Sequence, residues 1–452
     1  MTSKHDWEHD LAPEALPDDP RRISRRRFLE IATAAAAGMV IASCTPGRTP
    51  MPGAEAAPTD GLPSATSVPT GVATATEAPP TSTPAATSTS AAEAAAATAA
   101  EPTVGATATV EAATAEPAAT ATPAGLANRV AIGKAGSYDP QLIYITLRDM
   151  LDDIGGLGDI VRPGDRVALK TNLTGGLGNQ GPAGLTAMES FVTHPEVVRA
   201  LGKLVLDAGA AQLFIVEAVY QWGSYTEWGY EEVARDIGAT LIDLNSPEPY
   251  GDFVNVSVPG GGSGLYETYI FNPLLTELDA FMSVAKMKCH WTAGVTHSLK
   301  NLIGLVPAQF YHLRAQDNNR SEFHGPSDET AGHRVPRIIV DLNLAHPIDL
   351  AVIDGVMTTE GGEGPWLPTF GPIAPGVLFA GKDSVATDAV ATAAQGFDPT
   401  APGMKVPFVR SDNYLNLAAA AGLGTNRLSE IHTVGAALEE VQTPFKPCVV
   451  GG

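Results

Sequence analysis

The sequence predicts an α/β fold, in which a mainly parallel sheet carries helices on both faces and follows a disordered N-terminal tether. Two observations support this prediction. From residue 128 onward, short apolar runs typical of buried strands alternate with helical patterns. Residues 45–127, by contrast, consist almost entirely of Ala, Thr, Pro, Ser, Glu and Gly, which offer too little apolar bulk to offset the entropy of ordering a chain.

The first 44 residues are typical of an export signal. Residues 24–30, SRRRFLE, fit the twin-arginine pattern, and the apolar run 31–42 is too short to span a bilayer as a stable helix. The run ends in Ile-Ala-Ser-Cys44, which resembles the lipobox of bacterial lipoproteins. We therefore expect lipidation at Cys44, with the protein anchored on the outer face of the cytoplasmic membrane or on the cell surface. The alternative is a signal cleaved elsewhere, with an incidental cysteine.

The domain organisation follows from these patterns. Residues 1–44 are the signal peptide, 45–127 form a linker that lifts the domain off the membrane, and 128–452 form the α/β domain. The twin-arginine route usually carries folded proteins, which favours a cofactor or metal loaded before export.

Charge and cysteine content exclude several classes of function. The net charge of −22 disfavours nucleic acid as a partner, because a negative chain is repelled by phosphate backbones. Besides Cys44 the chain has only Cys289 and Cys448, which could pair. It contains no Cys-x-x-Cys, so a zinc or iron–sulfur site bound by cysteines is not expected.

The first strand–helix–strand unit lies between residues 166 and 216. A strand over 166–170 follows a Pro-Gly turn, and a helix opens at Thr193, which can act as its cap while Glu196 reaches back. Pro195 fits the first helical turn. The next strand covers 213–216, so a right-handed crossover joins two parallel strands.

The remaining elements repeat this alternation. A helix over 230–237 leads to a strand over 240–244. Asp383 can cap a final helix. Three further apolar runs read as buried strands, at 280–285, 350–353 and 377–380.

Polar clusters at the predicted strand ends are the candidate sites, because ligands of such sheets bind beyond the carboxyl ends of the strands. Lys170 and Asn172 precede a glycine-rich loop and could hold an anion, although they could equally form a polar turn. The strongest cluster follows the strand at 280–285 and comprises Lys286, Lys288, His290, His297, Lys300 and Asn301. It predicts an electropositive pocket for a carboxylate or phosphate, with histidine as acid, base or metal ligand.

A third cluster is acidic. Asp354 ends a predicted strand, and Glu360 and Glu363 lie on the glycine-rich loop that follows. Carboxylates on such a loop can hold a divalent metal ion, or they can be solvated loop residues.

These motifs together resemble the DUF362 family from about residue 130 to 397. The resemblance rests on Lys170-Thr-Asn172, the run 193–197, Lys286-Met-Lys288-Cys-His290, the run 296–304, Asp354-Gly355 with Glu360 and Glu363-Gly-Pro365, and the closing segment 380–389. The family has no settled activity. Some of its members carry ferredoxin-type cysteine clusters, which this chain lacks.

A more distant resemblance links the chain to lactate racemase-like proteins, in which a histidine precedes Ala-Gly and a lysine follows ten positions after the histidine. His290, Ala293-Gly294 and Lys300 keep this order and spacing. In that family the lysine bonds to a nickel-pincer nucleotide and the histidine transfers protons. Here His297-Ser298-Leu299 replaces the glycine pair before the lysine, and a second histidine motif has no counterpart.

The sequence therefore supports two hypotheses. In the first, the protein is an enzyme of isomerase or redox type that uses a cofactor or metal. Its lysines would hold a small oxyanionic substrate, and His290, Lys300 and His297 would act in catalysis. In the second, it is a tethered binding protein that captures an anionic ligand or metal without turnover.

Overall fold

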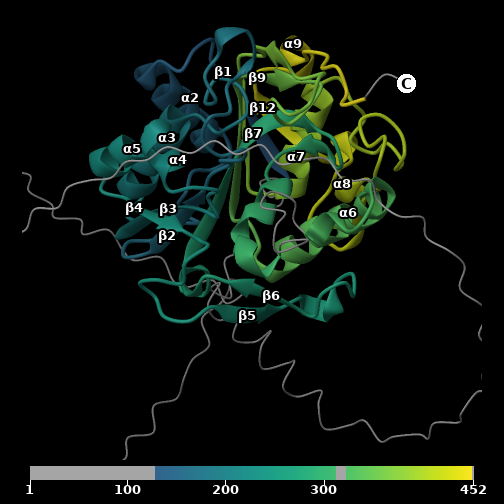
Figure 1. Cartoon of the computed structure of the whole chain (residues 1–452). Helices are drawn as coiled ribbons and strands as arrows, with labels where there is room; N and C mark the ends of the chain where they lie inside the picture. Colours follow the sequence, from purple (N-terminus) through teal and green to yellow (C-terminus); the bar gives the residue numbers. More distant parts are fainter. Residues whose placement is uncertain (1–127, 312–321, 450–452) are drawn as a thin grey trace, which may run out of the picture. The chain divides into compact units, whose positions relative to one another are not determined.

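The computed structural model describes residues 128–311 and 322–449 (Figure 1). The predicted signal, Cys44 and the linker over 45–127 lie outside the described residues. The described residues form a mixed, mainly parallel sheet with helices on both faces, which confirms the predicted fold class.

The large sheet has a parallel half and a mixed half. Its main path runs β12 (His432–Gly435), β1 (Arg129–Lys134), β11 (Val377–Gly381), β9 (Leu350–Glu360), β7 (Ala280–His290), β2 (Arg166–Lys170), β3 (Gln212–Glu217) and β4 (Thr240–Asp243). From β9 to β4 all neighbours are parallel, whereas β11 is antiparallel to both β9 and β1. Short strands extend the sheet or stand apart: β8 (Gly294–Thr296) pairs with β7, β10 (Gly371–Ile373) pairs with β9, and β5 (Val254–Ser257) pairs with β6 (Thr268–Phe271).

Helices cover both faces of the sheet, on either side of the strands in Figure 1. One face carries α2 (Pro140–Asp153), α3 (Pro195–Asp207) and α5 (Tyr230–Ile237), and the other carries α6 (Asp328–Ala345), α7 (Ser384–Ala394) and α8 (Tyr414–Ala420). The short helices are α4 (Gly223–Glu227), α9 (Leu438–Val441), η2 (Pro182–Gly184), η3 (Pro259–Gly261), η4 (Pro273–Thr276), η5 (Lys300–Leu305), η6 (Ala308–Phe310), η7 (Glu322–His324) and η8 (Leu428–Glu430).

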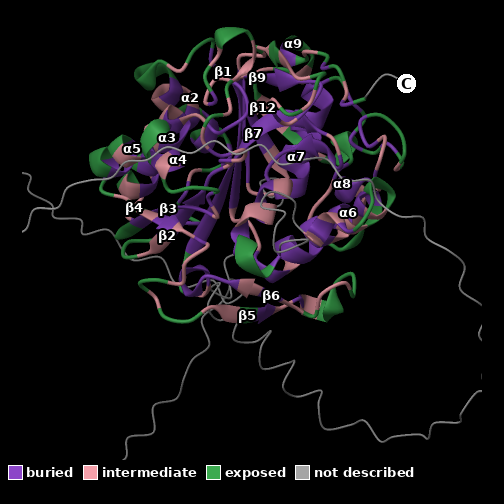
Figure 2. Cartoon of the chain, viewed as in Figure 1, coloured by how far each residue is buried: buried purple, intermediate pink, exposed green. Residues whose placement is uncertain are grey.

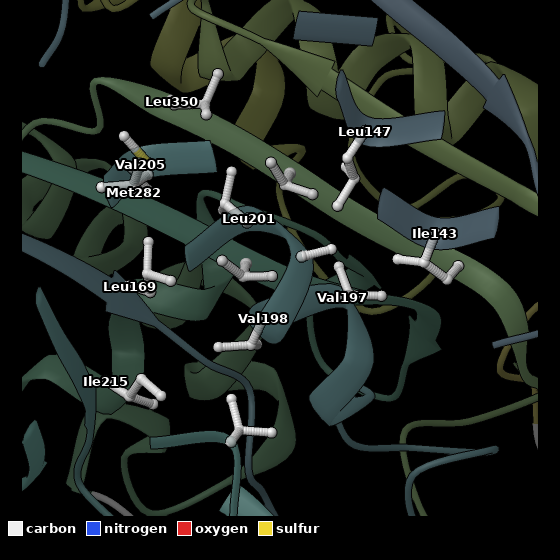
Figure 3. Packing of buried hydrophobic residues seen from close by; sticks show 14 of the residues in the cluster. Ile143, Leu147, Leu169, Val197, Val198, Leu201, Val205, Ile215, Met282 and Leu350 are labelled. Atoms are coloured by element: carbon white, nitrogen blue, oxygen red, sulfur yellow. The ribbon is translucent and has the colours of Figure 1, made fainter. Parts of the chain in front are cut away.

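Alternation along the strands explains how both faces become apolar. Leu169 and Ile215 pack beneath α3, whereas the residues that precede them, Ala168 and Phe214, belong to the core on the opposite face. Figure 3 shows the apolar stripe of α3 lying over these strands, and Figure 2 shows the central strands of the sheet mostly in purple, as buried residues. The sequence prediction of the β2–α3–β3 unit is thereby confirmed.

The start of α3 differs in detail from the sequence prediction. The capping residue is His194, whose Nδ1 accepts a hydrogen bond from the Glu196 N–H at 3.2 Å. Thr193 is engaged elsewhere: its hydroxyl accepts from the Asn172 N–H and donates to the Val284 carbonyl. Thr193 therefore ties three segments together instead of capping the helix.

Two strands are much longer than predicted. β7 continues to His290 and β9 to Glu360, because β8 and β10 hydrogen-bond to their extensions. Lys286 lies opposite Asp354 within paired strands, so neither residue is in a loop beyond a strand end. Because β7 and β9 are longer than predicted, Lys286 and Asp354 lie within the sheet and not beyond its edge.

Two further features of the described part bear on the sequence predictions. Cys289 and Cys448 are both buried free thiols, so the disulfide considered above is not formed. Across residues 128–311 and 322–449, we find no helix with the length and apolar character needed to cross a membrane.

Candidate functional site

The candidate site lies where the strand order reverses. From β2 the chain passes through α3 to β3 on one side, and from β7 it passes through α6 to β9 on the other side. In open α/β sheets such a reversal leaves a crevice outside the carboxyl ends of the two strands. A cavity of about 880 Å³ opens at this edge, over the ends of β2, β3 and β4, and η5 forms part of its wall.

A buried ion pair forms the base of the cavity. The Lys170 ammonium lies 2.8 Å from Glu217 Oε1 and donates hydrogen bonds to the Thr171 carbonyl at 2.7 Å and to Asn301 Oδ1 at 3.2 Å. Glu217 Oε2 accepts from the Leu173 N–H at 2.9 Å. Burial lowers the pKa of Lys170 and raises that of Glu217, while their mutual attraction opposes both shifts. The positive charge of Lys170 is thus already matched inside the protein.

Asn301 holds η5 against the end of β2 and the middle of β7. Its amide nitrogen donates to the Lys170 carbonyl and to Ser283 Oγ, both at 3.1 Å. Its oxygen accepts from the Lys170 ammonium and from Asn172 Nδ2, both at 3.2 Å. Asn301 and Asn172, both predicted to bind an anion, line the cavity. Part of their hydrogen-bonding capacity is already used by contacts within the protein.

Gly304 is required for the close approach of η5 to the ion pair. A Cβ atom at this position would lie 2.2 Å from Glu217 Oε1 and 2.9 Å from the Lys170 ammonium. The Gly304 carbonyl also accepts a hydrogen bond from the Ala218 N–H at 3.1 Å. Any side chain here would push the turn away from the strand ends.

Lys300 is the lysine of this cavity whose charge remains available to bind an anion. It precedes Asn301 in η5 and lines the cavity, and its ammonium has no hydrogen bond or ion pair with any residue that the structure describes. Burial lowers the pKa of Lys300 to about 8; the charge of Glu363 opposes this shift, and that of Lys170 adds to it. An ammonium that is partly removed from water and has no partner is stabilised by an anion placed beside it.

His290 ends β7 with its ring held in one orientation. Nδ1 accepts hydrogen bonds from the N–H groups of Thr292 at 3.0 Å and Ala293 at 3.1 Å, so a neutral ring carries its proton on Nε2. Burial lowers the pKa of His290, and the nearby positive charge of Lys300 lowers it further. The imidazole is therefore neutral at physiological pH and offers its Nε2–H as a hydrogen-bond donor. His290 is 8% exposed and is not among the described residues that line the cavity.

The structure does not bring Lys286 and Lys288 to the cavity. Lys286 donates to Asp354 Oδ2 at 3.0 Å, to the Tyr138 hydroxyl at 2.8 Å and to the Met188 carbonyl at 2.9 Å. Lys288 donates to the Phe191 carbonyl. Both are fully buried because the extended β7 places them inside the sheet, so their position gives no support to their predicted contact with an anionic ligand.

His297 also lies away from the cavity wall. It is fully buried, and its Nδ1 lies 3.5 Å from the hydroxyl of Thr392 in α7. Burial lowers the pKa of His297 to about 3, so the ring stays neutral in the core. This position gives no support to the predicted catalytic role, because His297 precedes η5 and packs in the core while Lys300 lines the cavity.

The three carboxylates predicted to bind metal are separated by their own partners. Asp354 pairs with Lys286 and accepts from the His194 N–H, whereas Glu360 Oε1 lies 2.6 Å from the Lys446 ammonium. Glu363 accepts from the backbone N–H of Trp291 at 2.8 Å and from the indole of Trp366 at 3.1 Å. Within the described part of the chain, no group of three or more His, Cys, Asp or Glu side chains could hold a metal ion.

Asp388 positions part of the site, a role that the sequence did not indicate. From α7 its carboxylate accepts hydrogen bonds from the Ser298 N–H at 2.9 Å, from the Ser298 hydroxyl and from the Leu299 N–H at 3.1 Å. These groups immediately precede Lys300, so Asp388 fixes the start of η5. Burial raises the pKa of Asp388 to about 7.

Glu217 and two aromatic residues of the cavity were also missed by the sequence analysis. Glu217 ends β3 as Lys170 ends β2, so the strand-end rule that selected Lys170 could have selected Glu217 as well. Tyr220 and Trp222 follow in the next loop and carried no motif.

Comparison with known proteins identifies the motifs as those of a described family. The family model DUF362, a domain of unknown function, matches residues 167–393, which is half of the chain. A curated relative, the thylakoid-associated protein sll1697 of Synechocystis sp., is 27% identical over 291 residues, covering 62% of this chain and 78% of the relative.

Two solved structures are similar at low identity. A lactate racemase apoprotein from Thermoanaerobacterium thermosaccharolyticum is 13% identical with a TM-score of 0.34, covering 61% of this chain and 59% of that one. A protein from Thermotoga maritima is 13% identical with a TM-score of 0.31, covering 58% of this chain and 60% of that one. The chain thus spans about three fifths of each of these proteins.

The raised pKa of Asp388 makes a prediction about stability and pH. The folded protein holds this proton more tightly than the unfolded chain, so the stabilisation is complete below pH 4 and is lost as the pH rises towards 7. Asp388→Asn should remove this dependence. From pH 5 to 8 the wild type should lose about 2–3 kcal/mol of unfolding free energy relative to the variant, measured by denaturant titration.

The control is Asp252→Asn, at an exposed position in the loop before β5. Its pH profile should follow that of the wild type. Parallel profiles for the wild type and Asp388→Asn would contradict the assigned role, whatever constant offset separates them.

Proposed function

Since the chain belongs to the DUF362 family, whose description assigns no activity, we propose a function from the site itself: the α/β domain binds a small anionic substrate in the cavity over the ends of β2, β3 and β4 and catalyses a proton transfer on it. The observation that carries this proposal is Lys300, a partly buried cation that lines the cavity and has no partner among the described residues. Its charge would hold the anionic group of the substrate.

His290 is the proposed acid–base residue. It is neutral, its ring is oriented by two backbone N–H groups, and its pKa responds to the charge of Lys300, which places the two side chains in the same electrostatic environment. The neutral ring can donate a hydrogen bond from Nε2–H to a bound anion, and to act as a base Nδ1 would have to release its backbone donors and take up the proton from the substrate. This chemistry fits isomerisation at a carbon next to a carboxylate.

A nickel-pincer cofactor is not assigned to this site. Lys300 and His290 match two positions of the lactate racemase-like pattern, but the chain lacks the glycine pair and the second histidine motif. The described carboxylates and histidines also form no metal set. We therefore derive no step through such a group.

A second candidate function is capture of an anion without turnover. The observation that favours it is the place of His290, which does not line the cavity with Lys300. The two functions share the same anion site and differ only in whether His290 reaches the ligand.

The proposal also includes the location of the protein. The twin-arginine motif, the lipobox cysteine and the linker support export with a lipid anchor at Cys44. The thylakoid-associated name of the Synechocystis relative is consistent with attachment at a membrane.

Replacing Lys300 tests the anion site. Lys300→Met keeps much of the side-chain volume and removes the charge, so binding of phosphate and of lactate should weaken roughly 10- to 100-fold, as measured by isothermal titration calorimetry. Lys405→Met, at an exposed position outside the cavity, makes the same change of charge and should bind like the wild type. Unchanged binding by Lys300→Met would refute the proposal.

His290→Gln distinguishes catalysis from capture. With lactate in D₂O as the probe, catalysis predicts exchange of the proton on the carbon next to the carboxylate, and this exchange should be lost in the variant while binding is retained. Binding without exchange by the wild type would favour capture.

The export proposal has its own prediction. In cells, replacement of both Arg25 and Arg26 by Lys should leave the protein in the cytoplasm, because the twin-arginine route reads that pair. Cys44→Ser should still permit export but release the protein from the membrane fraction. Membrane attachment of Cys44→Ser would contradict lipidation at this residue.

A further inference from the structure

The cavity has an aromatic rim next to its cationic wall. Tyr220 and Trp222 both line the cavity, yet they remain 47% and 49% exposed. Both lie in the loop that leaves β3, directly after Glu217. Large aromatic surfaces that stay exposed within a concave site have no partner inside the protein to cover them.

This rim is held in place by the surrounding loops. The ring of Trp222 packs edge-on against Tyr225 of α4, with 5.3 Å between the ring centroids. Between the two aromatic residues, Gln221 Oε1 accepts a hydrogen bond from the Leu177 N–H at 2.9 Å. The rings therefore offer a prepared surface, which lowers the entropy cost of binding.

The size of the cavity also points to a ligand larger than a three-carbon acid. Cavities that enclose organic ligands of drug size measure roughly 300–1,000 Å³. The 880 Å³ found here lies near the upper end of that range. A ligand that used Lys300 alone would leave the space next to Tyr220 and Trp222 to water.

We infer that the natural ligand is an anion that carries a flat ring, with its anionic group at Lys300 and its ring stacked on Tyr220 and Trp222. This inference rests on the proposed function, because Lys300 must hold the anionic group. Aromatic faces gain from offset or edge-to-face contact with another ring beyond the area they bury. A membrane surface fits less well, because polar side chains of Asn179, Gln221 and Asp243 share the cavity wall.

Two matched probes test the inference. Inorganic phosphate and phenyl phosphate share the anionic group and differ by the ring. The wild type should bind phenyl phosphate roughly tenfold more tightly than phosphate, as measured by isothermal titration calorimetry. In the double variant Tyr220→Ala and Trp222→Ala this advantage should disappear, while the affinity for phosphate should stay within about twofold of the wild type.

Phe310→Ala is the matched control. Phe310 is an exposed aromatic residue that packs against Phe253 and does not line the cavity, so this variant should keep the preference for phenyl phosphate. Thermal melting of each variant confirms folding, which exposed positions should preserve.

The outcomes separate the inference from the proposed function. Equal affinity of the wild type for both probes, no binding of phenyl phosphate, or a phenyl preference that survives the double substitution would overturn the ring inference. The anion site would stand if Lys300→Met still weakened phosphate binding. If Lys300→Met changed the affinity for neither probe, both the anion site and the inference would be overturned.

Discussion

The buried ion pair between Lys170 and Glu217 connects the ends of two parallel strands to the turn that forms the cavity wall. Removing either partner would leave an uncompensated charge in the interior, which typically costs about 3–5 kcal/mol. The pair also fixes its neighbours. Asn301 accepts a hydrogen bond from the same ammonium, and position 304 has room only for glycine because a Cβ atom would clash with the carboxylate. The position of η5, and with it that of Lys300, depends on this pair.

The same constraint explains why lysines close together in the sequence have different roles. Lys286 has a buried carboxylate, a phenol and a carbonyl as partners, so its charge is used inside the fold. Lys288 donates to a carbonyl within the same core. Lys300 follows a turn that is capped by Asp388, and this cap directs the residue to the cavity. The three lysines are therefore close together in the sequence, but only Lys300 presents its charge to the cavity.

Much of the fold could be predicted from the sequence because its strands are continuous apolar runs with clear turn signals. The β2–α3–β3 unit and the helix over 230–237 were placed nearly to the residue. The extensions of β7 and β9 could not be predicted, because they are stabilised by β8 and β10, which are three residues each and have no apolar pattern of their own. The misplacement of Lys286, Lys288 and Asp354 follows from that single omission.

The site could be predicted in part. The strand-end rule selected Lys170 and Asn172, and the lysine-rich segment selected Lys300 and Asn301; all four line the cavity. The sequence could not show that Lys170 is paired with Glu217, since the two residues lie on different strands and meet only through the register of the sheet. It also could not show that His297 faces α7, because the turn before η5 is irregular.

The proposed function depends on Lys300 being a partly buried ammonium without a partner among the described residues, and titration of this group tests it directly. NMR of ¹³C-labelled lysine side chains, with the signal assigned by its loss in Lys300→Met, would follow this group through the pH range. We expect Lys300 to have a pKa of about 8 in the free protein and a higher pKa when phosphate is bound. An ordinary lysine pKa near 10.5 that does not respond to phosphate would contradict it.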